Sequence, residues 1–568
     1  MTRSSRRVAL AVAALFVVSA SSIWLLARAT RPSYRLSAAQ AIAAARSDPG
    51  DREFLADHPA GRVRVIPLDD RLQRVTFFDG PRVVLDAGVA GNGQVLASER
   101  HLPGVPASGA RLANSPWILA LLGVLFLLAS MVVPLGRLRN LDALVLVSFT
   151  STVLLVNARL VAASVICGSL ALCYLMLRCL WVGLFAERRQ QSAPVRPLLS
   201  WLTWGWESHR RLRLLRLLVF ASALSFLMIT LSSSGYTDVA TASLSGATDL
   251  LHGVSPYGHI SLAVHGDTYP LLNYLLFLPA AVLTPVTNAF SDQSGALVLT
   301  ALCGLLVAGA LYRVADRRDS WRRAGEHENS EAALRMVLAW FAFAPVLLAA
   351  SGGSNDLVLA ALLAWMLAAR SKPALSLLLL CMAAWVKLVP LILLPLWVAS
   401  RHRVGVRVLI PAGALSLALG TLLITLGGFH AISQMLSAVA FQFQRGSFFA
   451  PWYTFDLRWL QPLVQAAMLC LLVVVCARQW RRRHAGGDHL AFAALAGALL
   501  LGVQLSANYW TWSYLPWVFP FVALTLLRDT SPTRPSQTIQ GSPPRAVEGP
   551  RRSRIAHPPA RRRAVPSA

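Results

Sequence analysis

The sequence predicts an α-helical polytopic membrane protein that carries a small exported α+β domain near its N-terminus. The mean hydropathy is +0.54 and charged residues make up 14% of the chain, whereas soluble domains hold about 25%. Many apolar runs reach the roughly 20 residues that a helix needs to cross a bilayer. The formal net charge is +27, but the arginines form short clusters between apolar runs, a pattern typical of membrane topology. We therefore expect membrane lipids and no nucleic acid among the partners.

Residues 1–30 have a basic start and an apolar stretch, which predicts an uncleaved membrane anchor, with a cleaved signal peptide as the alternative. Residues 31–114 then form the exported domain. Helical periodicity gives way near residue 62 to alternating apolar and polar residues, with turns at "DG" and "GNG". One helix and three or four strands are expected. This segment is weakly similar to PepSY-type exported domains, and we interpret it as a partner-binding or regulatory module.

About fourteen transmembrane helices are expected, counting the anchor. Three lie in residues 115–186, a basic cytoplasmic linker follows at 187–213, and the others belong to a core over 214–527. The tail at 528–568 is rich in Pro, Arg and Ser, so it is predicted to be disordered, basic and cytoplasmic. The spans expected after the anchor are 117–135, 141–156, 160–185, 214–233, 294–312, 333–350, 355–370, 374–388, 389–400, 405–426, 460–477, 490–507 and 512–527.

The arginine clusters also predict which loops face outward, because cytoplasmic loops collect Arg and Lys. All clusters and both termini face the cytoplasm if the apolar stretch 269–283 does not cross the membrane. We therefore expect this stretch to be an interfacial or re-entrant helix on the outer face. The outer loop then spans 234–293 and contains no Lys or Arg.

Two carboxylates of this loop are candidates for chemistry. Asp238 follows the span 214–233 by a few residues, where it would serve as a general base or as a solvated helix cap. Asp249 comes eleven residues later, about three helical turns, so both could share one face of a helix. Such a pair suits metal binding or acid–base work, although a solvated face is equally common. No metal site is predicted, no cofactor is required, and dependence on a divalent metal stays open.

Three polar residues sit at the boundaries of apolar segments. Asn355 and Asp356 open a span at the predicted outer surface. Lys387 lies between two short apolar halves, where an ammonium needs a partner or an anionic ligand such as a phosphate, unless it snorkels to the interface. The stretch "SANYWTWSYLPWVF" at 506–519 is dense in aromatic residues, which predicts a membrane aromatic belt or, alternatively, a sugar-stacking platform.

The order of these elements resembles one family. The segments are "YTDVATASLSGATDLLHGVSPYG", "TYPLLNYLLFLPAAVL", "GGSNDLVLAALLAWMLA" and "MAAWVKLVPLILLPLW". Over residues 210–527 they resemble the polyprenyl-phosphate-sugar-dependent glycosyltransferases of GT-C fold, and glycosyltransferase family 87 of actinobacterial envelope synthesis is the closest. The motif residues are Asp238, Gly253, Pro256, Tyr257, Tyr269, Pro270, Lys387 and Pro390. Leu271 replaces the second proline of the family's "Y-P-P-L" segment, and "DVATAS" lacks the tyrosines common after the family's Asp.

The resemblance implies a GT-C-like core and an inverting transfer of a sugar, with mannose the first candidate, from a polyprenyl-phosphate donor to an envelope glycan or glycolipid acceptor. The reaction would take place on the outer face of the bacterial plasma membrane. Asp238 is implied as the catalytic base and Lys387 as the group that binds the donor phosphate. The residues expected to bind acceptor or substrate are Asp249, Tyr257, Tyr269, Asn355 and Asp356. A transporter or flippase of lipid-linked sugars and a non-catalytic envelope scaffold are the alternatives.

Overall fold

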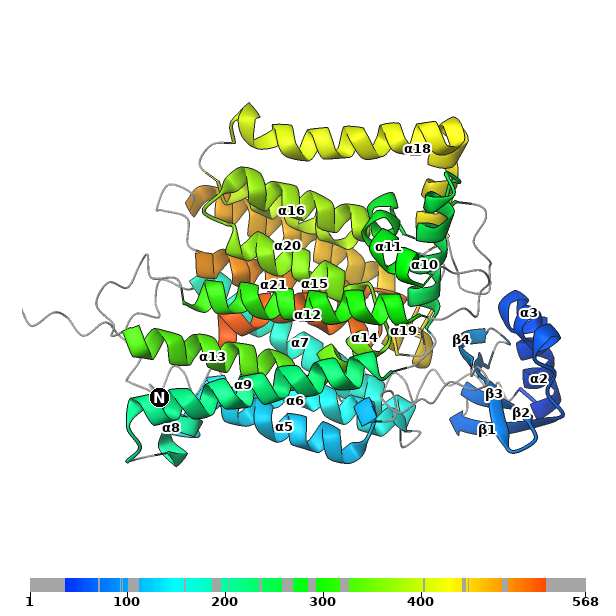
Figure 1. The fold of residues 1–568 in the computed structure, drawn as a ribbon, viewed down its shortest axis with the longest axis horizontal. Coiled ribbons are helices and arrows are strands. Elements are labelled where there is room, and N and C mark those ends of the chain that lie inside the picture. Colours follow the sequence, from blue (N-terminus) through cyan, green and yellow to red (C-terminus); the bar gives the residue numbers. More distant parts are fainter. Residues whose placement is uncertain are drawn as a thin grey trace, which may run out of the picture.

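The structure is a computed structural model with a bundle of long helices and a small sheet domain at one end of it (Figure 1). The predicted anchor 1–30, the tail 528–568 and the first part of the basic linker, 187–195, lie outside the described residues. The structure describes residues 36–69, 72–91, 93, 95–100, 112–157, 160–185, 196–203, 205–233, 237–257, 269–284, 293–316, 326–401, 404–441, 446–447, 449–482 and 489–527.

The N-terminal domain pairs two helices with an antiparallel sheet of order β1-β2-β3-β4. Val75 and Phe77 on one face of the sheet are buried in a core that also holds Phe54 of the second helix. The strands confirm the predicted alternation. The helical stretch divides in two at Asp48, because a residue that precedes a proline disfavours the helical conformation. The elements are α2 (Ala38–Ser47), α3 (Pro49–Asp57), β1 (Arg62–Asp69), β2 (Leu72–Asp79), β3 (Arg82–Ala90) and β4 (Val95–Arg100).

The remaining elements form the bundle, and their burial separates central helices from peripheral ones. The apolar window of α21 is 78% buried, whereas those of α9, α18 and α20 are each 17% buried, so these three present apolar side chains to the surrounding lipid. The elements are α5 (Pro116–Ser130), β5 (Val132–Val133), α6 (Leu138–Asn157), α7 (Val161–Phe185), β6 (Arg196–Pro197), α8 (Leu198–Leu202), α9 (Ser208–Leu231), α10 (Asp238–Leu251), α11 (Leu271–Leu283), α12 (Ser294–Ala315), α13 (Glu326–Ala342), α14 (Ala344–Ser351), α15 (Asp356–Ala368), α16 (Pro373–Val386), η4 (Val389–Ile392), α17 (Leu393–Ala399), α18 (Val406–Phe441), α19 (Pro451–Thr454), α20 (Gln461–Arg482), α21 (His489–Ser506), η6 (Trp512–Tyr514), α22 (Leu515–Val522) and η7 (Ala523–Leu527).

Helix length supports fewer spans than the fourteen expected. Seven described helices are long and apolar enough to cross a membrane, namely α6, α7, α9, α12, α18, α20 and α21, and α13 with α14 makes an eighth if the pair is one span bent by 54°. The other expected spans are apolar helices of 10–17 residues, about 15–25 Å long, which is short of a hydrocarbon core of about 30 Å. They are 117–135, 355–370, 374–388, 389–400 and 512–527.

Arginines gather at the end of the bundle that lies away from the sheet domain (Figure 1). Arg370 donates to the hydroxyl of Ser400 at 2.7 Å, and Arg401 donates to the carbonyl oxygen of Arg370 at 2.6 Å. Arg478 of α20 donates to the carbonyl oxygen of Leu184 in α7 at 2.9 Å. These contacts join the ends of α7, α15, α17 and α20, so one end of the bundle is distinctly basic.

A buried ion pair joins two of the helices that precede the core. Arg178 of α7 donates from two nitrogens to the two carboxylate oxygens of Asp142 in α6, each at 2.8 Å, and the Tyr174 hydroxyl donates to the same carboxylate at 2.8 Å. Bidentate pairing offsets much of the cost of burying both charges. Because α7 packs in turn along α21, the helices of residues 115–186 belong to the same bundle as the core.

Helices α10 and α11 lie side by side at the end next to the sheet domain, and they run across the direction of the long helices (Figure 1). The 13 residues of α11 cover the stretch that is expected to stay on the outer face. Gly246 of α10 allows the close approach, because a Cβ there would collide with the buried ring of Tyr274 in α11. This packing fixes the position of α10, which opens the outer loop.

Gly246→Ala should therefore force α10 away from α11 and lower the free energy of unfolding by about 1–3 kcal/mol, the usual cost of overpacking. Gly309→Ala is the matched control, because Gly309 also lies inside a helix but a Cβ there would meet nothing within 4 Å. That variant should be neutral or more stable by up to about 1 kcal/mol. Thermal unfolding of both variants in one detergent provides the measurement, and equal melting temperatures would show that the Gly246 contact is not tight.

Candidate active site

A tight loop between α14 and α15 forms the centre of the candidate site. Gly353 adopts a φ of +63°, and a Cβ there would lie 3.0 Å from the Cβ of Ala240 in α10, so the position favours glycine. The hydroxyl of Thr237, the N-cap of α10, donates to the carbonyl oxygen of Gly352 at 2.5 Å. The loop is thereby held against the N-terminal end of α10, and it leads directly into the first turn of α15.

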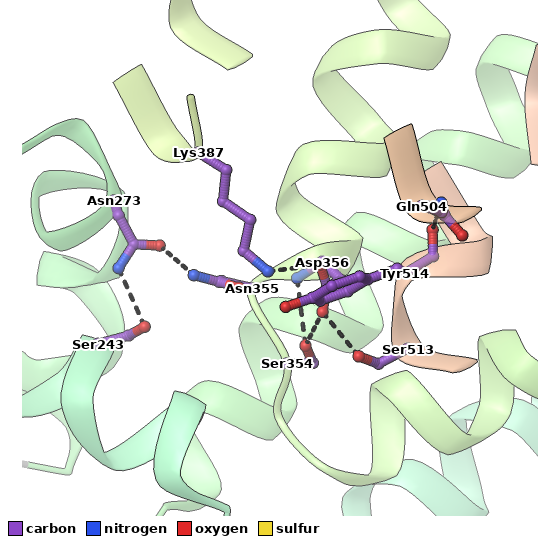
Figure 2. Close-up of polar contacts among 9 residues, drawn as sticks. All are labelled: Ser243, Asn273, Ser354, Asn355, Asp356, Lys387, Gln504, Ser513 and Tyr514. Atoms are coloured by element: carbon purple, nitrogen blue, oxygen red, sulfur yellow. Dashed lines mark hydrogen bonds and ion pairs between the residues drawn. The ribbon is translucent and has the colours of Figure 1, made fainter. Parts of the chain in front are cut away.

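Asp356 and Lys387 form an ion pair, with Nζ 2.6 Å from Oδ1 (Figure 2). Asp356 begins α15 and its side chain is 1% exposed, whereas Lys387 follows the last residue of α16 and its side chain is 12% exposed. The second carboxylate oxygen accepts hydroxyl hydrogen bonds from Ser354 at 2.6 Å and from Ser513 at 3.0 Å. Lys387 therefore has the partner that a buried ammonium requires, and the snorkelling alternative is wrong.

Two aromatic rings flank the ammonium of Lys387. Its Nζ lies 4.8 Å from the centroid of the Tyr514 ring and 5.7 Å from that of the Tyr269 ring, within the range of cation–π attraction. Tyr269 precedes α11, and Tyr514 belongs to the aromatic stretch that follows α21. One carboxylate and two rings thus confine the ammonium, which limits the directions from which an anion can reach it.

A second polar chain runs from α10 to the same loop. Asn355 donates from Nδ2 to Oδ1 of Asn273 at 2.8 Å, and Asn273 donates to the Ser243 hydroxyl at 3.0 Å (Figure 2). All three side chains are fully buried. Within the described part of the chain, Oδ1 of Asn355 accepts no hydrogen bond, which costs about 1–3 kcal/mol.

Asp238 and Asp249 occupy opposite ends of α10. Asp238 is its first residue, directly after Thr237, and its side chain lies outside the described part of the structure. Asp249 lies in the last turn and is half-buried. Eleven residues of helix separate their backbones by about 16 Å. Joint action of the two carboxylates stays a prediction.

Tyr257 is buried behind the site and contacts the backbone of Tyr269. Its ring is fully buried, and its hydroxyl donates to the carbonyl oxygen of Tyr269 at 2.9 Å. The amide of Tyr269 donates to the hydroxyl of Tyr274 at 3.3 Å. These two buried phenols fix the backbone at Tyr269 and hence the ring beside Lys387. Tyr257 therefore contacts the backbone of the site, and its contact with substrate stays a prediction.

Comparison with protein families identifies the segment that carries most of this site. Residues 268–507 match the model of Glycosyltransferase family 87. The chain carries a glycosyltransferase family 87 domain. With its apolar helices, it is a membrane glycosyltransferase, and the family resemblance is confirmed. No curated protein and no solved structure matches the chain.

The family 87 domain contains the ion pair but not the whole site. Helix α10, with Asp238 and Asp249, precedes it, and the segment that supplies Ser513 and Tyr514 follows it. Sequence patterning missed Asn273, Ser354 and Ser513 as members of the site. Their only local signal is that each is a polar residue beside an apolar or aromatic run, which is also true of many residues outside the site.

Removing one member of the Asp356–Lys387 pair should strongly destabilise the family 87 domain, because the other charge is then buried without a partner. Asp356→Asn leaves the ammonium without its carboxylate and Lys387→Met leaves the carboxylate without its cation, so each should cost about 3–5 kcal/mol. The double variant should lose less than the sum of the two single losses, as measured by thermal unfolding in detergent. Losses that simply add would show that the two groups do not interact.

The exposed pair of Glu207 and Arg210 on α9 is the control for this cycle. Its atoms lie 3.8 Å apart and both side chains are more than half exposed. Water and salt screen such a pair. Arg210→Met should therefore leave the melting temperature unchanged, which separates the effect of burial from that of removing a charge.

Proposed function

We propose that this membrane glycosyltransferase transfers mannose from a polyprenyl-phosphate donor to a cell-envelope glycan or glycolipid on the outer face of a bacterial plasma membrane. The observation that carries the proposal is Lys387, an ammonium held inside the family 87 domain by Asp356 and two aromatic rings. A cation fixed in apolar surroundings suits the phosphate of a lipid-linked donor.

The separation of charge along the bundle supports the outer-face assignment. The end with Arg370, Arg401 and Arg478 lies opposite the end with α10 and α11. Arginines collect on the cytoplasmic side of membrane proteins. With the basic end in the cytoplasm, α10, the loop that precedes α15 and the sheet domain face outward, together with both predicted carboxylates.

The depth of the ion pair supports a donor that stays in the membrane. The 13 residues of α15 run from Asp356 toward Arg370 at the basic end, a length of about 20 Å. The hydrocarbon core is about 30 Å thick. With Arg370 at the cytoplasmic surface, a helix of this length would put Lys387 below the outer surface of the membrane, where the phosphate of a polyprenyl lipid can reach it.

The proposed reaction is a single displacement. Asp238 accepts the proton of the acceptor hydroxyl, whose oxygen forms a bond to the anomeric carbon of the sugar. The bond from that carbon to the phosphate oxygen breaks, and the polyprenyl phosphate leaves with the electron pair, so the anomeric configuration inverts. Lys387 faces the oxygen on which negative charge develops, which stabilises the transition state more than the ground state.

The remaining candidates divide between acceptor binding and support. We assign Asn355, Asp249 and Tyr269 to the acceptor side. Asp356 has both carboxylate oxygens engaged by the chain itself, so its proposed role changes from acceptor binding to orienting Lys387. The family 87 domain supports this enzyme over a flippase or a non-catalytic scaffold.

Asp238→Asn should lower sugar transfer at least about 100-fold, because a general base contributes 10²–10⁴-fold. The assay uses purified protein in lipid nanodiscs with radiolabelled polyprenyl-phosphate mannose and a crude envelope-lipid acceptor fraction. Asp316→Asn is the matched control, since Asp316 is the C-cap of α12 and not part of the site, so this variant should keep full activity. Transfer that survives in Asp238→Asn would overturn the assignment of the base. A wild-type protein inactive with mannose, arabinose and other lipid donors would overturn the proposed transfer.

A further inference from the structure

The segment that follows α21 enters the site although it lies beyond the family 87 domain. We infer that Ser513 and Tyr514 are positioning residues for Lys387 and set the affinity for the donor phosphate, an inference that rests on the proposed function. Both belong to the single turn of η6, and both reach the ion pair from the side opposite Asn273 (Figure 2).

Buried hydrogen bonds fix this segment in place. Gln504 of α21, which is 2% exposed, donates to the carbonyl oxygen of Tyr514 at 2.9 Å and accepts from Nε1 of Trp510 at 3.0 Å. The hydroxyl of Ser447 donates to the carbonyl oxygen of Trp510 at 2.8 Å. A loop held at both ends by buried side chains presents Ser513 in one orientation, which a mobile aromatic belt at the membrane surface would not do.

Ser513 controls how strongly Asp356 competes for the ammonium. Its hydroxyl and that of Ser354 both donate to Oδ2, and Lys387 contacts Oδ1. The two hydroxyl bonds hold the carboxylate plane and draw negative charge toward Oδ2. An ammonium has three N–H donors, and the carboxylate in this orientation contacts Nζ through one oxygen only. The remaining donors can then face a phosphate, and the hydrogen bond of Ser513 maintains that geometry.

Tyr514 controls the direction of approach. Its ring face stands 4.8 Å from Nζ of Lys387 and excludes water from that side, while the Tyr269 ring stands at 5.7 Å. The attraction requires the ring and not the phenol hydroxyl. Phenylalanine should therefore replace Tyr514 with little loss, whereas leucine, which is apolar but smaller and has no π-face, should not.

The test measures binding of farnesyl phosphate to the full-length protein in phosphatidylcholine nanodiscs, with farnesol as the probe that has the same tail and no phosphate. Ser513→Ala and Tyr514→Leu should each raise the Kd for farnesyl phosphate about tenfold and leave the Kd for farnesol unchanged. Ser513→Thr and Tyr514→Phe should restore wild-type affinity. Ser148→Ala is the control. Ser148 of α6 is also a half-buried serine, but its hydroxyl donates to the carbonyl oxygen of Val145 and not to a group of the site.

Wild-type affinity for farnesyl phosphate in both Ser513→Ala and Tyr514→Leu would overturn the inference. An equal loss of farnesol and farnesyl phosphate would also overturn it, because that result indicates a general packing role. The two substitutions act on different groups, so a failure of one variant to fold leaves the other as a valid test. A protein that binds farnesyl phosphate as expected but transfers no sugar would contradict the proposed function and not the positioning roles.

Discussion

The ion pair between Asp356 and Lys387 constrains the rest of the site, because each of these buried charges is stable only while it faces the other. Burying an ion in a medium of low dielectric constant costs several kcal/mol even after the protein relaxes. The 2.6 Å contact offsets part of this cost, and the hydroxyls of Ser354 and Ser513 satisfy the second carboxylate oxygen. The ends of α15 and α16 and the turn η6, which supply these groups, must therefore lie next to one another at the same level of the bundle.

Helix length meets that requirement. Asp356 begins α15 and Lys387 follows the end of α16, and the two helices have 13 and 14 residues. Each is about 20 Å long, and the two helices pack against each other, so Asp356 and Lys387 lie at the same level of the bundle. Two of the short helices that make the count of spans smaller than expected, α15 and α16, position the ion pair.

Sequence patterning predicted the elements well and their contacts poorly. Each expected span in the described part of the chain coincides with an apolar helix, because hydropathy is a local property. Helix ends depend on tertiary packing and on turns such as the one at Gly353, so lengths were wrong. The apolar flanks of Lys387 showed that it needs a partner. They did not show which one, since Asp356 is 31 residues away, and Ser513 lies 157 residues from Asp356.

The helices ahead of the family 87 domain pack against the segment that supplies Ser513 and Tyr514, and one of these contacts is made by a tryptophan. Gly168 of α7 lies against the ring of Trp510, since a Cβ there would be at an ordinary contact distance of 3.4 Å from it. Trp510 binds Gln504, which in turn holds the backbone of Tyr514. The sheet domain touches the same bundle at α7 through β1. Packed elements therefore connect the sheet domain, through α7 and Trp510, to the segment that carries Tyr514.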